Sequence, residues 1–464
     1  MCVTTEVNDK LQLKGSKKRE ERNRAIGLGI EDLGDQFLPG QARGVSFVSR
    51  LQCVQSAVET KIEKIYRESP SKRVGIITFS SEVTLLGDCK QEPHIVAGDK
   101  LYSWDQLQEA GASFTIERNI SESKEDILEK LWDIEESGPT ALGPALQLSI
   151  AIAGSKPGSS VILCTDGLAN VGLGSLDGTN SEVTPYYVEL AEQAKLKGVS
   201  VSVISLIGSE CCLEKLSIVT EQSAGTVQRV DPIELTGKMG GLIDVPVLGY
   251  TTMAMIILHR GLQFRGEMDD EKENRNWIVR DMGNVNSDTE LTVSYGFRPK
   301  EQYDLTNINS VPFQIQLMYS KPNGTRVLRI STVMLNLTDN RQQAEKLADV
   351  TVIGTHAALR AAKLAKEGDY QSAQLEARSA QRFMVRNSVA PEKVANWSAN
   401  VEEFDNVVRN EQLFSILDED DDAMEIDNES SINRKSKPKR KVRSDQTVEA
   451  LSKGKAQNAK SLFM

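Results

Sequence analysis

Short apolar strand segments alternate with amphipathic helical segments between residues 45 and 244, and this alternation constrains the fold more than any other sequence feature. Residues 73–79, 161–165 and 199–206 are rich in β-branched side chains, which is typical of strands buried on both faces. Helical spacing occurs at residues 47–65, 125–134, 145–153, 186–196 and 233–242. This order predicts βαβ units and a parallel sheet covered by helices, in which ligands bind at the carboxyl ends of the strands.

Downstream of residue 245 the sequence pattern changes twice. Strand segments without intervening helices come first, at residues 253–259, 277–279, 291–295, 313–319 and 327–334. The Asn323-Gly324 turn between the last two predicts a hairpin, and the spacing predicts an antiparallel β-sandwich. Helical spacing then returns at residue 340. Gly368 breaks the first helix, residues 370–385 form a second, and Pro391 starts a third.

The fold class predicted is therefore multi-domain: a doubly wound α/β domain, an antiparallel β-sandwich and an α-helical domain. The expected regions are a polar arm or insertion (1–44), the α/β domain (45–244), the sandwich (245–339), the helical domain (340–416) and a disordered charged tail (417–464). The tail contains the acid block at 418–422 and a basic cluster at 435–441. Adjacent blocks of like charge with few apolar residues do not favour folding.

Composition and motifs exclude several classes of function. The net charge of −11, from 55 basic and 66 acidic side chains, argues against nucleic-acid binding. No apolar run approaches the ~20 residues of a membrane span, and residues 1–10 contain no signal-peptide core. There is no C-x-x-C pair, no G-x-S-x-G elbow and no G-x-x-x-x-G-K-[ST] loop. We therefore expect no enzyme activity and a cytoplasmic protein with free or buried thiols.

Three segments in the α/β region resemble a von Willebrand factor A domain. They are VGIITFSS at 74–81, SGPTAL at 137–142 and VILCTDG at 161–167, in this order, within residues 45–244. The order of the modules that follow, together with RGLQFR at 260–265, resembles the trunk, β-sandwich and helical modules of COPII inner-coat subunits. A similar order occurs in A-domain proteins that include the circularly permuted Ras proteins.

The resemblance implies a metal-ion-dependent adhesion site, in which three loops supply oxygen ligands to Mg²⁺. Carried over by motif, Thr140 matches the second loop and Asp166 the third. The first loop, Asp-x-Ser-x-Ser at the end of the first strand, is missing, so we expect the chain to begin just past it and the sheet to lack that strand. Residues 177–181 imitate the motif but follow no apolar strand, and they are interpreted as a loop. With only two protein ligands, the site should bind Mg²⁺ weakly. Alternatively, Thr140 is only a residue at the start of a helix and Asp166 only a residue of a turn.

These observations predict an intracellular interaction or scaffold protein that binds protein partners through an A-type domain. In an intact relative, a carboxylate of the partner would complete the coordination of the metal. Two alternatives stay open: a vesicle-coat-like structural subunit that binds without metal, and a regulatory remnant of a GTPase-linked A-domain protein. Lys437, Lys439, Arg440 and Lys441 predict a nuclear fraction if they act as an import signal rather than as a solvated linker.

Overall fold

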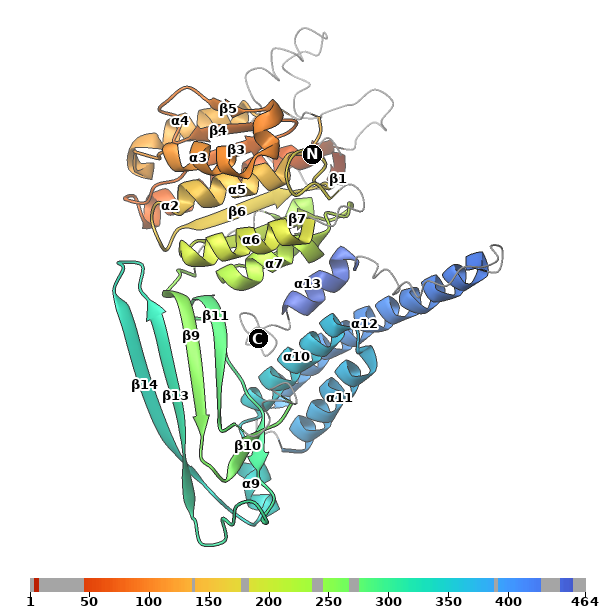
Figure 1. Cartoon of the computed structure of the whole chain (residues 1–464). Coiled ribbons are helices and arrows are strands. Elements are labelled where there is room, and N and C mark those ends of the chain that lie inside the picture. Colours follow the sequence, from red (N-terminus) through yellow and green to blue (C-terminus); the bar gives the residue numbers. More distant parts are fainter. Residues whose placement is uncertain are drawn as a thin grey trace. The chain divides into compact units, whose positions relative to one another are not determined.

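The computed structural model describes residues 4–7, 46–135, 138–176, 183–235, 245–266, 275–387, 391–426 and 443–453. The chain divides into two compact units (Figure 1). Unit 1 comprises Met1–Glu221 and Gly225–Pro246, and unit 2 comprises Gln222–Ala224 and Val247–Met464. Each unit has hydrophobic clusters of its own.

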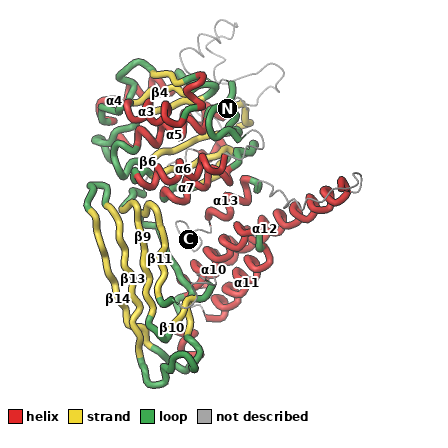
Figure 2. The backbone as a smooth tube through the Cα atoms, in the orientation of Figure 1, coloured by secondary structure: helices red, strands yellow, loops and turns green. Residues whose placement is uncertain are grey.

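Unit 1 mixes strands and helices, as the alternation of segments predicts (Figure 2). Its strands are β1 (Thr4–Val7), β2 (Ser46–Ser49), β3 (Ile76–Phe79), β4 (Val83–Gly87), β5 (His94–Val96), β6 (Ser160–Thr165), β7 (Ser200–Leu206) and β8 (Val227–Val230). Its helices are α2 (Arg50–Glu68), η2 (Gly98–Tyr102), α3 (Trp104–Ser113), α4 (Ile120–Trp132), α5 (Leu142–Ala153), α6 (Val183–Leu196), α7 (Leu213–Ser223) and η3 (Pro232–Glu234).

The main sheet of unit 1 is split into two three-stranded sheets. Strands β6, β7 and β8 are parallel, whereas β3, β4 and β5 form an antiparallel meander. In the described part of the chain, β3 pairs only with β4 and β6 pairs only with β7. Helix α5 contacts both β3 and β6. Helix α2 also joins the two sheets, because Val58 packs in one cluster with Ile162 of β6 and in another with Ile76 of β3.

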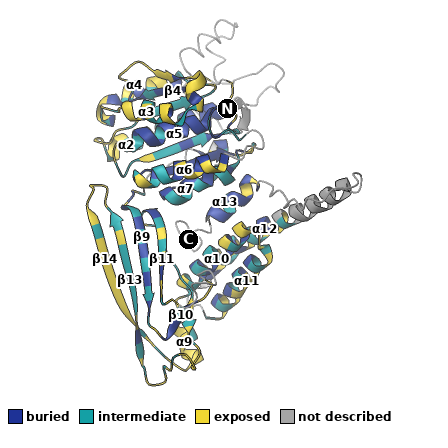
Figure 3. Ribbon diagram, in the orientation of Figure 1, coloured by how far each residue is buried: buried dark blue, intermediate teal, exposed yellow. Residues whose placement is uncertain are grey.

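β3 and β6, which each have an edge without a paired strand among the described residues, are less buried than β7. Every residue of β7 is buried, whereas β3 is half-buried throughout and β6 is buried at only two positions (Figure 3). The amide of Ser200 donates to the carbonyl of Ser159. Because backbone groups alternate in direction along a strand, those of Ile162 and Cys164 point to the edge of β6 that faces away from β7. Within the described residues, no strand pairs with β6 along this edge.

The structure corrects several details of the predicted α/β region. Helix α2 begins at Arg50 and not at residue 47, because Ser49 forms a capping box with Gln52 and residues 46–49 are a strand. Helices α3 and α7 and strand β5 lie in segments for which no element was predicted. Residues 4–7 of the expected polar arm pair with β2. The remainder of that arm, the predicted helix beyond residue 235 and the motif-like loop at 177–181 lie outside the described residues.

Unit 2 begins with antiparallel strands. These are β9 (Gly249–Leu258), β10 (Leu262–Phe264), β11 (Trp277–Val285), β12 (Tyr295–Phe297), β13 (Ser310–Ser320) and β14 (Arg326–Asn336). Four of them form a sheet in the order β11-β9-β13-β14, and β10 pairs with β12. The predicted hairpin is confirmed: the amide of Gly324 donates to Lys321 O at the β13–β14 turn, with φ of +82° at Gly324. The antiparallel pairing of these strands was predicted correctly, but the predicted β-sandwich is not confirmed. Beside the four-stranded sheet, the described part contains only the pair of three-residue strands β10 and β12.

The helices of unit 2 are α9 (Arg341–Leu347), α10 (Val350–Glu367), α11 (Tyr370–Asn387), α12 (Pro391–Ile426) and α13 (Asp445–Lys453). The single helix expected from residue 340 is two helices, because the Asp349 side chain accepts from the amides of Thr351 and Val352 and starts α10. Gly368 ends α10 in the left-handed conformation, as predicted. The apolar residues Val394, Trp397, Val401 and Val408 of α12 form part of the core, because they are buried together with alanines of α10 and α11.

Two segments of the tail that was expected to be disordered from residue 417 are helical in the structure. Helix α12 includes the acid block and ends at Ile426, and residues 445–453 form α13. Leu451 joins the helical core, and Nη2 of buried Arg443 donates to the carbonyl of Lys366 in the last turn of α10. Apolar side chains at helical spacing in α13 outweigh the charge of the surrounding sequence. No described helix is long and apolar enough to cross a membrane.

Candidate functional site

The two predicted site residues lie in loops that hydrogen bonds join at the carboxyl edge of β6. Asp166 directly follows β6, and Thr140 precedes α5. The Thr140 amide donates to Asn170 Oδ1 at 2.6 Å, and the Asn170 amide donates to the Thr140 carbonyl at 3.0 Å. A Cβ atom on Gly167 would lie 4.0 Å from Thr140 Oγ1. The structure therefore brings the Thr140 hydroxyl close to the loop that begins at Asp166.

A guanidinium group, not predicted from the sequence, pairs with Asp166. Nη1 of Arg50 lies 3.5 Å from Asp166 Oδ2, and the two side chains are 8% and 13% exposed. The same Nη1 donates to Ser209 Oγ at 3.0 Å, and Nη2 donates to the Ile207 carbonyl at 3.2 Å. Ser209 Oγ in turn donates to the Asp166 carbonyl. The loop that follows β7 therefore completes a buried polar cluster with the loop that follows β6.

Local backbone features place Arg50 in this cluster. It is the first residue of α2, directly after the Ser49 cap. A cation at a helix N-terminus meets the positive end of the helix dipole, so its position is unfavourable unless an anion compensates. Asp166 is that anion. Gly208 allows the approach, because a Cβ atom there would lie 2.3 Å from Arg50 Nη2, and its φ is +109°.

The residues of this cluster do not fit a Mg²⁺ ion. Mg²⁺ takes carboxylate, hydroxyl and water oxygens in an octahedron. Thr140 and Asp166 supply two such groups, but the guanidinium of Arg50 already pairs with the carboxylate and would repel a divalent cation. No group of three or more His, Cys, Asp or Glu side chains suited to a metal occurs among the described residues. The site is therefore a polar cluster with an internal cation.

Two thiols near the sheet formed by β6, β7 and β8, those of Cys164 and Cys53, are not suited to nucleophilic chemistry. Burial raises the pKa of Cys164, on β6, to about 12. Burial, with a smaller contribution from the charge of Asp231, raises the pKa of Cys53, on α2, to about 11. Both thiols therefore stay protonated near neutral pH, and the thiol is a much weaker nucleophile and metal ligand than the thiolate.

Sequence reasoning found Thr140 and Asp166 but missed Arg50, Ser209 and Asn170. A signal existed for Ser209, which follows a predicted parallel strand at the edge where ligands bind. Arg50 carried no such signal, because it lies within a helical pattern in which a charged residue is ordinarily solvated. Its role depends on a contact with a residue more than a hundred positions away.

Comparisons with known proteins show what the whole chain is similar to. No family model matches the sequence. The chain is 32% identical over 350 residues to the protein named circularly permutated Ras protein 1 of Dictyostelium discoideum. That alignment covers 74% of this chain and 41% of the relative, so the chain spans about two fifths of the relative's length.

Solved structures with a similar fold include the human COPII-coat protein Sec24c. The TM-score is 0.50 at 14% identity, over 77% of this chain and 53% of that chain. A von Willebrand factor type A protein from Catenulispora acidiphila matches with a TM-score of 0.46 at 12% identity, over 88% of this chain and 85% of that one. The resemblance inferred from the sequence is thus confirmed by the similarity of the chain to a circularly permuted Ras protein and by the similarity of its fold to Sec24c.

Proposed function

We propose that this chain is a protein-interaction or scaffold protein that binds a partner at the carboxyl edge of β6, without catalysing a reaction and without a metal ion. The observation that carries the proposal is the coupling of the loops at this edge. Thr140 and Asn170 are joined by two hydrogen bonds, and Arg50 joins Asp166 to Ser209. Loops held in one conformation lose little entropy on binding, which favours recognition.

The polar groups exposed at the carboxyl edge of β6 indicate what kind of partner surface can bind there. Asn170 is exposed and Thr140 is half-buried, so amide and hydroxyl groups are available to a ligand. The internal ion pair replaces the adhesion-site metal, so the partner needs no carboxylate to complete a coordination sphere. A polar protein surface with hydrogen-bond donors and acceptors suits this edge. The proposal places the protein in the cytoplasm.

A binding experiment with matched variants tests the proposal. Partners of the full chain are identified by proximity labelling, and the affinity of each purified partner is measured by calorimetry with Mg²⁺ or with EDTA. Asn170→Ala removes the acceptor of the Thr140 amide and should weaken binding about tenfold or more. Lys156→Glu, at an exposed position before β6 and so at the opposite end of that strand, is the control and should bind normally.

Two results would contradict this function in different ways. Wild-type affinity in both Asn170→Ala and Thr140→Ala would show that the partner binds elsewhere. Loss of binding in EDTA would show that a metal is required at the interface. The first result concerns where the partner binds and the second concerns the need for a metal, so each part of the proposal is tested separately.

A second candidate is a coat-like structural subunit that binds through the sheet and helices of unit 2. The fold similarity to Sec24c favours it. Cross-linking distinguishes the two candidates, because a coat-like subunit would cross-link to its partner through unit 2 and not through the Thr140 loop. The third candidate, a regulatory remnant of a GTPase-linked protein, is favoured by the relative named as a Ras protein.

A further inference from the structure

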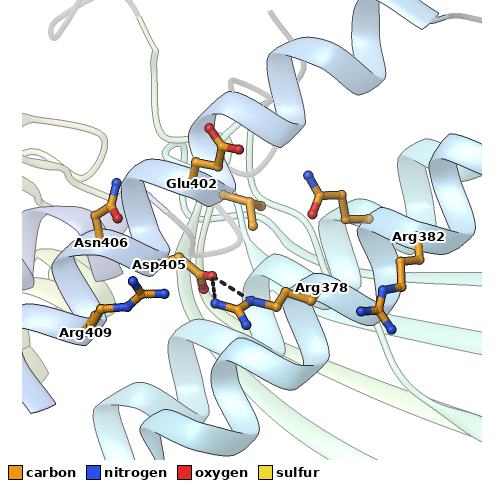
Figure 4. Close-up of a pocket in the computed structure, with 8 residues that line it drawn as sticks. Arg378, Arg382, Glu402, Asp405, Asn406 and Arg409 are labelled. Atoms are coloured by element: carbon orange, nitrogen blue, oxygen red, sulfur yellow. Dashed lines mark hydrogen bonds and ion pairs between the residues drawn. The ribbon is translucent and has the colours of Figure 1, made fainter.

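A groove in unit 2 runs between α11 and α12, and charged side chains of both helices line it (Figure 4). Its volume is about 480 Å³. Three arginines, Arg378, Arg382 and Arg409, line the groove together with the carboxylates of Glu402 and Asp405. The three arginines are exposed, so a ligand can reach their guanidinium groups from solvent.

The acidic residues of the groove neutralise only one of the three arginines. Asp405 Oδ2 accepts from Arg378 Nε at 2.9 Å and lies 2.8 Å from its Nη2. Arg382 and Arg409 have no ion-pair partner among the described residues. The Glu402 carboxylate points away from the Arg378–Asp405 pair (Figure 4). Two guanidinium groups, each with five N–H donors, are therefore available to an anionic ligand.

The three arginines form a row along the groove, with the ion pair at its centre. Only three residues, 388–390, separate α11 from α12, and helices joined by so short a connection run antiparallel. Arg382 lies one turn after Arg378 on α11, and Arg409 lies one turn after Asp405 on α12. Because the helices run in opposite directions, these turns extend to opposite sides of the central pair, as Figure 4 shows. At about 6 Å per four residues, the Cα atoms of Arg382 and Arg409 lie about 12 Å apart along the helix axes.

We propose that this groove binds an extended acidic segment of a partner protein, with two carboxylates four positions apart. An extended chain rises about 3.3 Å per residue, and alternate side chains point to the same side. Its first and fifth side chains therefore lie about 13 Å apart on one side, which matches the separation of Arg382 and Arg409. The residues between them face the neutral Arg378–Asp405 pair. The contacts with Asp405 use Nε and Nη2 of Arg378, so its Nη1 can donate to a backbone carbonyl of the segment.

The dimensions of the groove favour an extended segment over other anionic ligands. A helical segment about 12 Å long and 10 Å wide occupies roughly 900 Å³, which is more than the groove holds. A single phosphate group spans less than the distance between the two free guanidinium groups, so it would pair with only one of them. A segment with two separated carboxylates can pair with both at once, and each pair adds to the affinity.

A short synthetic peptide tests this proposal on the full chain. The probe is a fluorescein-labelled heptapeptide with Glu at its second and sixth positions and Ser or Thr elsewhere, and binding is measured by fluorescence anisotropy. We expect saturable binding that weakens as salt rises, because the ion pairs are exposed and screened. A peptide of the same charge with its two Glu residues adjacent should bind several-fold more weakly, because it cannot reach both arginines.

Charge reversal at the two ends of the row supplies the matched variants. Arg382→Glu with Arg409→Glu should raise the Kd of the probe about tenfold or more, because two attractions become repulsions. A peptide with Lys in place of both Glu residues should bind this double variant and not the wild type, which also shows that the double variant is folded. Lys363→Glu makes the same change of charge at an exposed position of α10, outside the groove, and should bind the probe normally.

Three outcomes would overturn the proposal. The first is a wild-type chain that does not bind the probe at low salt, or that binds phosphatidylserine vesicles instead. The second is equal affinity for the peptides with separated and adjacent Glu residues. The third is a double variant that binds the original probe as tightly as the wild type does. None of these outcomes depends on the partner-binding edge of unit 1, and Asn170→Ala should bind the probe normally.

Discussion

Nη1 of Arg50 lies 3.5 Å from Oδ2 of Asp166, and this contact joins the first residue of α2 to the loop after β6. The guanidinium also donates to Ser209 and to the carbonyl of Ile207. A cation supplied by the chain itself therefore neutralises the carboxylate that the sequence motif assigned to a metal.

This ion pair predicts the response of the protein to divalent cations. We expect Mg²⁺ and Mn²⁺ to bind weakly or not at all, because Arg50 repels a second cation at Asp166. Isothermal titration of the full chain measures this directly. Micromolar affinity that disappears in Asp166→Ala would show that a metal displaces the guanidinium.

The same pair predicts a large stability effect of Arg50. Arg50→Met leaves the 13%-exposed Asp166 carboxylate without its guanidinium partner, and we expect a loss of about 3 kcal/mol in the free energy of unfolding. Arg67→Met, in the same helix, breaks the exposed i,i+4 pair with Glu63 and should have a much smaller effect on the free energy of unfolding. Denaturant unfolding compares them. Equal losses in the two variants would mean that the buried pair contributes no more than a surface one.

The open edge of β6 predicts an alternating pattern of amide exchange. The amides of Val161 and Leu163 point to β7 and should exchange slowly, while those of Ile162 and Cys164 point to the open edge and should exchange faster. Residue-resolved hydrogen exchange measures the difference. Uniform protection in the present chain would mean that another segment already fills this edge.

The docking of α13 predicts how the C-terminal region responds to mutation. Leu451→Ala removes an apolar contact with the helical core, so α13 should open more often. We expect tryptic cleavage after Lys453 to accelerate about tenfold or more. Gln446→Ala changes an exposed position of the same helix and is the control. Equal cleavage rates in the wild type and in Leu451→Ala would show that the contact does not hold α13.

The basic cluster at 435–441 predicts a nuclear fraction, and it lies outside the described residues. Residues 417–464 are fused to a fluorescent protein and imaged in cells. Changing Lys439, Arg440 and Lys441 to Ala should reduce the nuclear fluorescence, because an import receptor would bind these charged side chains. An unchanged distribution would identify the cluster as a solvated linker.

The sequence predicted those elements whose signal is local. Residues 161–165 and 200–206 are strands because β-branched runs have few alternatives, and Gly368 ends α10 because it can adopt a positive φ. Helices α3 and α7 were missed because their apolar residues are few and lie among polar ones. In the candidate site, Thr140 and Asp166 were identified because their sequence segments match the motif, and the motif specifies the loops in which they lie. Arg50 required knowledge of a contact across the fold, which no local pattern contains.

The split sheet of unit 1 also has a mechanical consequence. A continuous sheet resists a pulling force because its backbone ladder must be sheared. Between β3 and β6 the described structure has no such ladder, and α2 and α5 hold the two half-sheets together through side-chain contacts. Under tension that separates the half-sheets, this seam would yield first, at a force set by the packing of Val58 and its neighbours.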